Sequence, residues 1–127
     1  MSGNTIQITP VLPVTDMGRT LAFYRDVLGF APYVVAAGFA YMAREGAAVR
    51  LMHHAITDGS FKAATAYIEV NDLSLVCDQI GDALTRLPEG RVVGPVDQAN
   101  YQRELYVRDP DGNLIIFGQM IPAAPTA

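Results

Sequence analysis

The stretch Val14–Phe30, VTDMGRTLAFYRDVLGF, contains a complete helix with its start and stop signals. Asp16 can accept hydrogen bonds from the unpaired N–H groups of the first helical turn. Apolar residues then recur at the spacing of one helical face, at Met17, Leu21, Tyr24 and Leu28. Gly29 suits the end of the helix because glycine adopts a left-handed conformation without steric cost. The sequence therefore predicts a helix that begins after Asp16 and ends near Gly29.

The same pattern occurs a second time in the chain. Six positions of this stretch have a counterpart of matching character later in the chain, all at one constant offset. The first set is Val14, Asp16, Met17, Leu21, Tyr24 and Leu28. Their counterparts, in the same order, are Val70, Asp72, Leu73, Cys77, Ile80 and Leu84. Self-similarity at a fixed spacing is the signature of a repeated structural unit. We therefore expect two copies of one module within a single domain of residues 1–127.

Composition and charge narrow the classes of function. Of the 127 residues, 50% are hydrophobic and 17% charged, so the chain can form a packed core. The net charge of −4 argues against nucleic acid as a partner, because phosphate binding requires a basic surface. The single cysteine, Cys77, excludes an internal disulfide and a zinc site built from several thiolates. There is no membrane-spanning apolar run and no signal pattern, so we expect a soluble, cytoplasmic protein.

Short strand patterns separated by turn residues follow each predicted helix. In the first module, strands are predicted at Ile6–Val14, Tyr33–Ala37, Phe39–Arg44 and Ala47–His53. In the second, they are predicted at Ala64–Asn71, Arg91–Val96, Glu104–Arg108 and Asn113–Met120, with a helix over Leu73–Arg86. Pro10 and Pro13 place the first strand at a sheet edge, because proline cannot donate to a ladder. The prediction is an α+β fold of two βαβββ modules, about residues 5–54 and 64–120, with a linker at 55–63 and a tail at 121–127.

Three passages resemble the vicinal oxygen chelate superfamily, which includes glyoxalase I, extradiol dioxygenases and the bleomycin and fosfomycin resistance proteins. They are Val14–Phe30, Tyr67–Asp72 and Arg103–Phe117, the last with the turn Arg108-Asp109-Pro110-Asp111-Gly112-Asn113. The resemblance implies paired βαβββ modules whose curled mixed sheets form a cleft. The chain is most similar to bleomycin resistance proteins, through Thr9-Pro10-Val11-Leu12, Phe39-Ala40 and Arg103-Glu104. Those proteins are dimers that sequester a cationic antibiotic in clefts between chains, and they are not enzymes.

Catalytic members of the superfamily hold a divalent metal with His, Gln or Glu, one ligand from each of four strands. The resemblance places these positions at Thr9, Arg50, Thr65 and Ile116. Two neutral hydroxyls, an aliphatic side chain and a permanently charged guanidinium make a poor ligand set. We therefore expect no metal and no other cofactor. A non-standard site at His54 and Glu69 would offer only two ligands.

The resemblance and strand alternation together predict a ligand-binding surface. Met52, His54, Tyr67 and Glu69 alternate onto the side of their strands that carries the four superfamily positions. Phe39, Tyr67 and Tyr101 match positions where bleomycin resistance proteins carry aromatic residues, and flat rings suit stacking on a planar heteroaromatic group. For Phe39 and Tyr67 an ordinary place in the core is the alternative. The candidate ligand-binding residues are Phe39, Tyr67, Tyr101, Met52, His54, Arg50, Glu69 and Ile116.

These observations lead to a binding protein as the first hypothesis. We expect a metal-free homodimer that sequesters an aromatic antibiotic or a related metabolite. The antibiotic can be cationic or uncharged. Its first strand, interrupted by prolines, suits a segment that crosses to a partner chain. An ion pair between Arg50 and Glu69 is expected; without it, Arg50 would favour an anionic ligand. The alternative is a metal-dependent lyase, isomerase or dioxygenase of the same superfamily with non-standard ligands. A third option is a dimeric domain that binds an endogenous metabolite.

Overall fold

Two four-stranded mixed sheets form the framework of the computed structural model, which describes residues 3–54, 61–99 and 101–121. The first module comprises β1 (Val11–Val14), α1 (Met17–Asp26), β2 (Ala31–Ala36), β3 (Phe39–Arg44) and β4 (Ala47–His53). The second comprises β5 (Thr65–Glu69), α2 (Leu73–Leu84), β6 (Val92–Asp97), β7 (Gln102–Arg108) and β8 (Leu114–Met120). The βαβββ order occurs twice, so the predicted α+β fold is confirmed.

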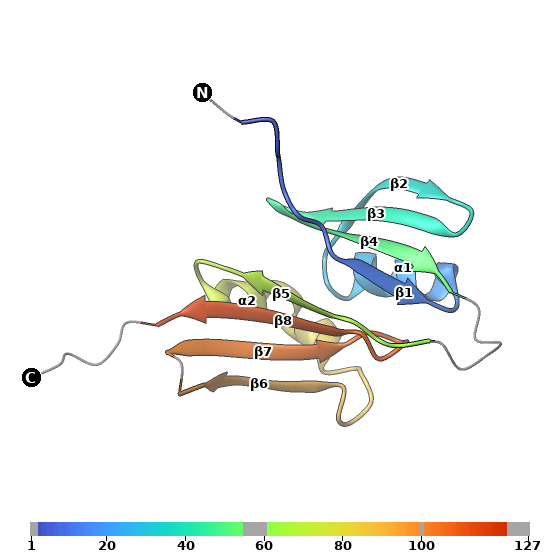
Figure 1. The fold of residues 1–127 in the computed structure, drawn as a ribbon. Helices are drawn as coiled ribbons and strands as arrows, with labels where there is room; N and C mark the ends of the chain where they lie inside the picture. Colours follow the sequence, from blue (N-terminus) through green and yellow to red (C-terminus); the bar gives the residue numbers. More distant parts are fainter. Residues whose placement is uncertain (1–2, 55–60, 100, 122–127) are drawn as a thin grey trace, which may run out of the picture.

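The two sheets share one topology, with strand orders β1-β4-β3-β2 and β5-β8-β7-β6 (Figure 1). The strand before each helix pairs in parallel with the last strand of its module, and the other pairs are antiparallel. α1 lies behind the first sheet and α2 behind the second, on the same side of the molecule (Figure 1). Within the described residues, no helix covers the opposite face of either sheet, which we call the open face.

The largest difference from the predicted strands is at the start of the chain. The first strand was expected from Ile6, whereas β1 begins at Val11. Pro10 has no N–H to donate, and its carbonyl accepts a hydrogen bond from the Arg50 amide instead. Residues 3–10 form an N-terminal arm in which Ile6 and Ile8 are 91% and 94% exposed. β1 lies at a sheet edge, as the prolines predicted.

The predicted linker and tail fall largely on residues 55–60 and 122–127, which lie outside the described residues. The limits of the two modules and of the linker therefore stay predictions. Every other predicted strand and the second helix have their observed ends within two residues of the expected ones, and α1 ends at Asp26, three residues before Gly29.

Both helices begin at the predicted caps. The Asp16 side chain accepts from the Arg19 amide at 3.0 Å, and the Asp72 side chain accepts from the Ser74 amide at 3.0 Å. Gly29 follows α1 with a φ of 76°, the left-handed conformation expected of it. The apolar faces of both helices join one core that includes Leu12, Val14, Tyr24, Leu28, Leu51, Leu73, Ile80, Leu105, Ile115 and Phe117. Neither of these two helices, within the described residues, is long and apolar enough to span a membrane.

A buried carboxylate connects the two modules. Asp109 follows β7 and is 1% exposed. Its Oδ2 accepts from the Tyr24 hydroxyl of α1 and from the Asn113 side-chain amide, both at 2.8 Å. Its Oδ1 accepts from the backbone amides of Asp111 and Asn113 at 2.8 and 2.9 Å. Burial raises the pKa of Asp109 and these hydrogen bonds oppose the rise, so the carboxylate is held by four donors from both modules.

Neighbouring residues of the same turn extend this connection. Asn113 is fully buried and donates from its side-chain amide to the Pro13 carbonyl of β1 at 2.8 Å. Asp111 accepts from the hydroxyls of Thr15 and Thr20 at 2.5 and 3.0 Å, just before and within α1. The turn after β7 thus fixes the end of β1 and the start of α1 against the second module.

Replacing Tyr24 with Phe should lower the free energy of unfolding by about 1–2 kcal/mol, because it removes a buried donor to Asp109. The edge-to-face contact with Phe30, with ring centroids 5.7 Å apart, would be retained. Urea unfolding measures the change. Tyr33→Phe is the matched control, since Tyr33 is 71% exposed. A Tyr24→Phe variant as stable as the parent would show that the carboxylate does not hold the modules together.

Candidate ligand-binding site

Strand alternation places most of the predicted ligand-binding residues on the open faces. In β4, Val49 and Leu51 are buried in the core, and Arg50 and Met52 alternate with them. The same rule and the strand registers bring six predicted residues to the open faces: Phe39, Arg50 and Met52 in the first module, and Tyr67, Glu69 and Ile116 in the second. His54 and Tyr101 lie outside the strands.

Arg50 is the centre of the open face of the first module. Its Nε donates to the Thr9 hydroxyl at 3.0 Å. Its guanidinium carbon lies 5.6 and 5.0 Å from the ring centroids of Phe39 and Tyr41, and cation–π contacts of this kind contribute roughly 0.5–1 kcal/mol at exposed sites. The expected ion pair with Glu69 is absent from the described residues, so that prediction is wrong. The guanidinium is held by a hydroxyl and two rings instead.

A hydrogen-bonded cluster occupies the open face of the second module. The Tyr67 hydroxyl donates to Glu104 Oε2 at 2.7 Å, and the Tyr106 hydroxyl donates to Glu104 Oε1. Gln98 Nε2 in turn donates to the Tyr106 hydroxyl at 2.9 Å. Burial and the hydrogen bond to Glu104 raise the pKa of Tyr67 to about 12. The hydrogen bond to Glu104 also raises the pKa of Tyr106, so both tyrosines stay protonated at neutral pH and can act as donors.

The four positions that the resemblance assigns to the metal ligands of superfamily enzymes carry no suitable ligand set. The Thr9 hydroxyl accepts from Arg50, which puts a permanent positive charge where a cation would bind. Ile116 is the β8 partner of Tyr67, and Thr65 pairs with Leu114 in the same ladder. Within the described ranges, no three His, Cys, Asp or Glu side chains are grouped to hold a metal ion. The side chains present do not fit a divalent metal.

His54 and Glu69 do not form a common site. The His54 amide donates to the Val14 carbonyl at 2.8 Å, and its ring lies 5.6 Å from the Phe61 ring centroid. Glu69 lines a groove together with Ala48, near the opposite end of β4. About six extended residues, roughly 20 Å of strand, separate Ala48 from His54. The two side chains are therefore too far apart to share an ion.

Tyr101 occupies the connection between β6 and β7. It is 53% exposed and adopts a left-handed conformation with a φ of 62°. Its amide donates to the Gln98 carbonyl at 3.2 Å, and its carbonyl accepts from the Ile121 amide at 2.9 Å. The backbone of Tyr101 is thus fixed while its ring stays accessible.

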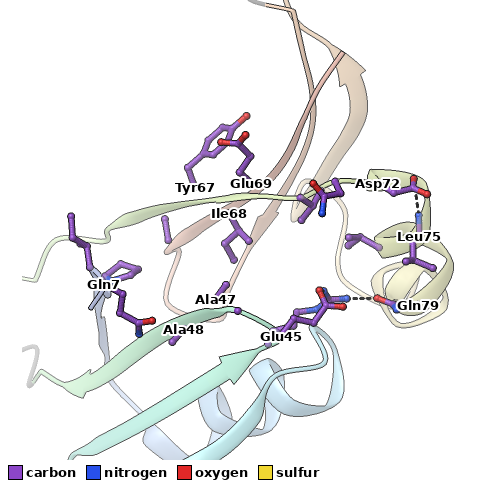
Figure 2. Close-up of a pocket in the computed structure, with 18 residues that line it drawn as sticks. Gln7, Glu45, Ala47, Ala48, Tyr67, Ile68, Glu69, Asp72, Leu75 and Gln79 are labelled. Atoms are coloured by element: carbon purple, nitrogen blue, oxygen red, sulfur yellow. Dashed lines mark hydrogen bonds and ion pairs between the residues drawn. The ribbon is translucent and has the colours of Figure 1, made fainter. Parts of the chain in front are cut away.

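A groove of about 720 Å³ separates the two modules (Figure 2). It is lined by the arm, the β3–β4 turn, β5 and the start of α2, with Gln7, Glu45, Ala48, Ile68, Leu75 and Gln79 among its residues. Tyr67 and Glu69 also line it, but Figure 2 shows their side chains on the other side of β5 from Ile68. The eight predicted residues are therefore not gathered in one pocket of one chain. Most of them lie on the two open faces.

Two tyrosines of the open faces, Tyr41 and Tyr106, were not predicted from the sequence. Tyr41 stands two residues after Phe39 on β3, and Tyr106 stands two residues after Glu104 on β7. Residues two apart in a strand share a face. Alternation from the neighbouring residues would therefore have found both.

Comparison with known proteins agrees with this architecture. Residues 6–117 match the family model of the Glyoxalase/Bleomycin resistance protein/Dioxygenase superfamily. The crystal structure of a bleomycin-binding protein complexed with bleomycin is 27% identical, with a TM-score of 0.76, over 91% of this chain and 98% of that chain. The structure of a bleomycin resistance determinant encoded on transposon Tn5 has the same identity and coverage, with a TM-score of 0.77.

A virulence protein of Salmonella typhimurium is 29% identical in an alignment 118 residues long, which covers 87% of this chain and 81% of that protein. The family match spans most of the sequence and both modules. The chain belongs to the Glyoxalase/Bleomycin resistance protein/Dioxygenase superfamily.

Proposed function

We propose that this protein binds a planar small molecule on its open faces and sequesters it without transforming it. The observation that carries the proposal is the arginine at a superfamily metal position, held by Thr9 and by two rings. An arginine at this position cannot bind a metal ion, and the two rings beside it form an aromatic surface. Aromatic faces suit stacking on planar groups. The similar bleomycin-binding protein, whose structure contains bleomycin, supports a ligand of this class.

The charges of the two open faces indicate how such a ligand would be oriented. The first module presents the Arg50 guanidinium, and the second presents the carboxylate of Glu69, with the buried Glu104 carboxylate beneath its tyrosines. Opposite charges on opposite parts of a site favour a ligand with complementary ends. Because Arg50 is not paired with Glu69, an anionic or hydrogen-bond-accepting group of the ligand would lie near Arg50 and a cationic group near the second module. An aromatic antibiotic with a cationic group, or a related metabolite, meets both requirements.

We also propose that the functional form is a homodimer. Apolar side chains are exposed on the arm and the open faces, among them Ile6, Ile8, Met52 and Met120. Gln7 holds the arm near β3 by donating to the Tyr41 hydroxyl at 2.8 Å. Large exposed apolar surfaces mark interaction sites, and a second copy would cover them. A ligand enclosed between two faces would lose more of its contact with water than one bound to a single face.

Calorimetric titration with metal-free and with copper-loaded bleomycin tests the proposed function. We expect measurable binding of bleomycin, and we expect Tyr101→Ala to weaken it by about 1 kcal/mol because a stacked ring is lost. Tyr33→Ala is the matched control, since it removes an exposed ring from β2. The absence of heat at high protein concentration would remove bleomycin as a ligand.

Light scattering tests the dimer separately. The parent protein should have the mass of two chains. The double variant Ile6→Ser, Ile8→Ser should shift the mass toward one chain, because it removes the two most exposed apolar side chains of the arm. A parent protein with the mass of one chain at every concentration would contradict the homodimer.

A further inference from the structure

Glu104 is buried although it lies on an open face. In β7 it alternates with the core residue Leu105, and in the sheet it pairs with Gly118 of β8. Its exposed fraction is nevertheless 6%. The cover is provided by Tyr67 and Tyr106, whose hydroxyls donate to its two carboxylate oxygens. A buried carboxylate requires such donors, because its desolvation is otherwise costly.

Gly118 is the position that allows Tyr67 to reach this carboxylate. Tyr67 pairs with Ile116 in the ladder, and its ring extends diagonally across β8 over the neighbouring Gly118. A Cβ atom added at Gly118 would lie 1.9 Å from the Tyr67 hydroxyl oxygen, 2.4 Å from Cζ and 2.8 Å from Cε1. Heavy atoms cannot approach so closely. Any side chain at this position would therefore displace the Tyr67 ring from the sheet.

We propose that Gly118 is a positioning residue of the ligand-binding face, which holds the Tyr67 ring flat across β8 and over Glu104. This inference rests on the proposed function in one respect, namely that Tyr67 contacts the ligand. The ring is 46% exposed, so one of its surfaces is available for stacking. A phenol that donates to a carboxylate has an electron-rich ring, and electron-rich rings attract cations. The ring therefore suits the ligand already proposed, a flat aromatic group that carries positive charge.

The surroundings of Tyr67 agree with this ligand class. Glu69 pairs with Gly118 from the β5 side, as Glu104 does from the β7 side, so two carboxylates flank the glycine. The nearest cation of β7 on the same face is Arg108, which lies two same-face positions beyond Glu104 along the strand. Its guanidinium donates to the Gly112 carbonyl. The adjacent Arg103 alternates to the other face and pairs with Asp97 at 2.7 Å. The described residues around Tyr67 therefore present negative charge.

Gly118→Ala tests the positioning role without any ligand. The tyrosinate absorbance is followed through an alkaline titration of the folded protein. In the parent, the pKa of Tyr67 is raised to about 12 by burial and by Glu104. In the variant, the displaced hydroxyl should titrate near the ordinary value of roughly 10. Tyr67→Phe identifies the group, because it removes this titration. Gly81→Ala is the matched control, since a Cβ added there meets no atom within 4 Å apart from its chain neighbours and the backbone of its own helix.

A double-mutant cycle separates displacement of the ring from a general effect on β8. Gly118→Ala should lower stability in the parent background but not in a Tyr67→Ala background, where the ring is already absent. Equal effects in the two backgrounds, or an unchanged Tyr67 titration in Gly118→Ala, would overturn the positioning role. Both measurements test the positioning role without a ligand, so their results do not depend on whether the proposed function is correct.

The ligand class is tested with N-methylquinolinium and the uncharged quinoline, followed by NMR of the ligand. The parent should bind the cation more tightly, and Gly118→Ala should weaken cation binding by roughly fivefold, the loss of one stacked ring. Absence of any preference for the cation would overturn the ligand class. Unchanged binding by a variant in which the Tyr67 titration has moved would show that the ring is not part of the ligand-binding face. That outcome would contradict the proposed function at Tyr67 but leave the positioning role intact.

Discussion

The arrangement of this molecule depends on one buried carboxylate. Removing Asp109 from water is unfavourable by itself, and the cost is offset only when all its donors are in place. One of those donors, the Tyr24 hydroxyl, comes from the helix of the other module, and Asn113 links the same carboxylate to the Pro13 carbonyl of β1. The two modules are thus joined at one end by directional bonds.

In both modules, aromatic side chains cover a charged group on the open face, and the two charges have opposite signs. In the first, the Arg50 guanidinium is covered by the rings of Phe39 and Tyr41. In the second, the Glu104 carboxylate is covered by Tyr67 and Tyr106. In each case aromatic side chains fix a charge and also provide the surface on which a flat molecule would stack. The duplicated scaffold therefore supplies two aromatic surfaces whose charges are complementary.

The sequence predicts well those features that depend on neighbouring residues. Helix caps at Asp16 and Asp72, the left-handed Gly29 and the alternation of β4 follow from local chemistry, and the structure contains each of them. The first strand was predicted too long because its apolar pattern continues through the arm, whereas Pro10 removes a ladder donor. The pattern of apolar residues therefore does not by itself show where a strand begins.

Contacts between distant residues could not be predicted in the same way. Alternation assigns Arg50 and Glu69 to a face but does not say which side chains are their neighbours, so the expected ion pair was wrong. Tyr24 and Asp109 are 85 positions apart and belong to different modules. Gly118 gives no signal at all in the sequence, because a glycine within a strand pattern does not reveal which ring lies above it.

Whether the protein captures its ligand without a metal can be decided by elemental analysis of protein purified without chelators, combined with a ligand titration before and after chelator treatment. Arg50 bound to Thr9 predicts much less than one divalent metal per chain and an affinity that the chelator does not change. One tightly held transition metal per chain, or binding or turnover that the chelator abolishes, would contradict capture without a metal.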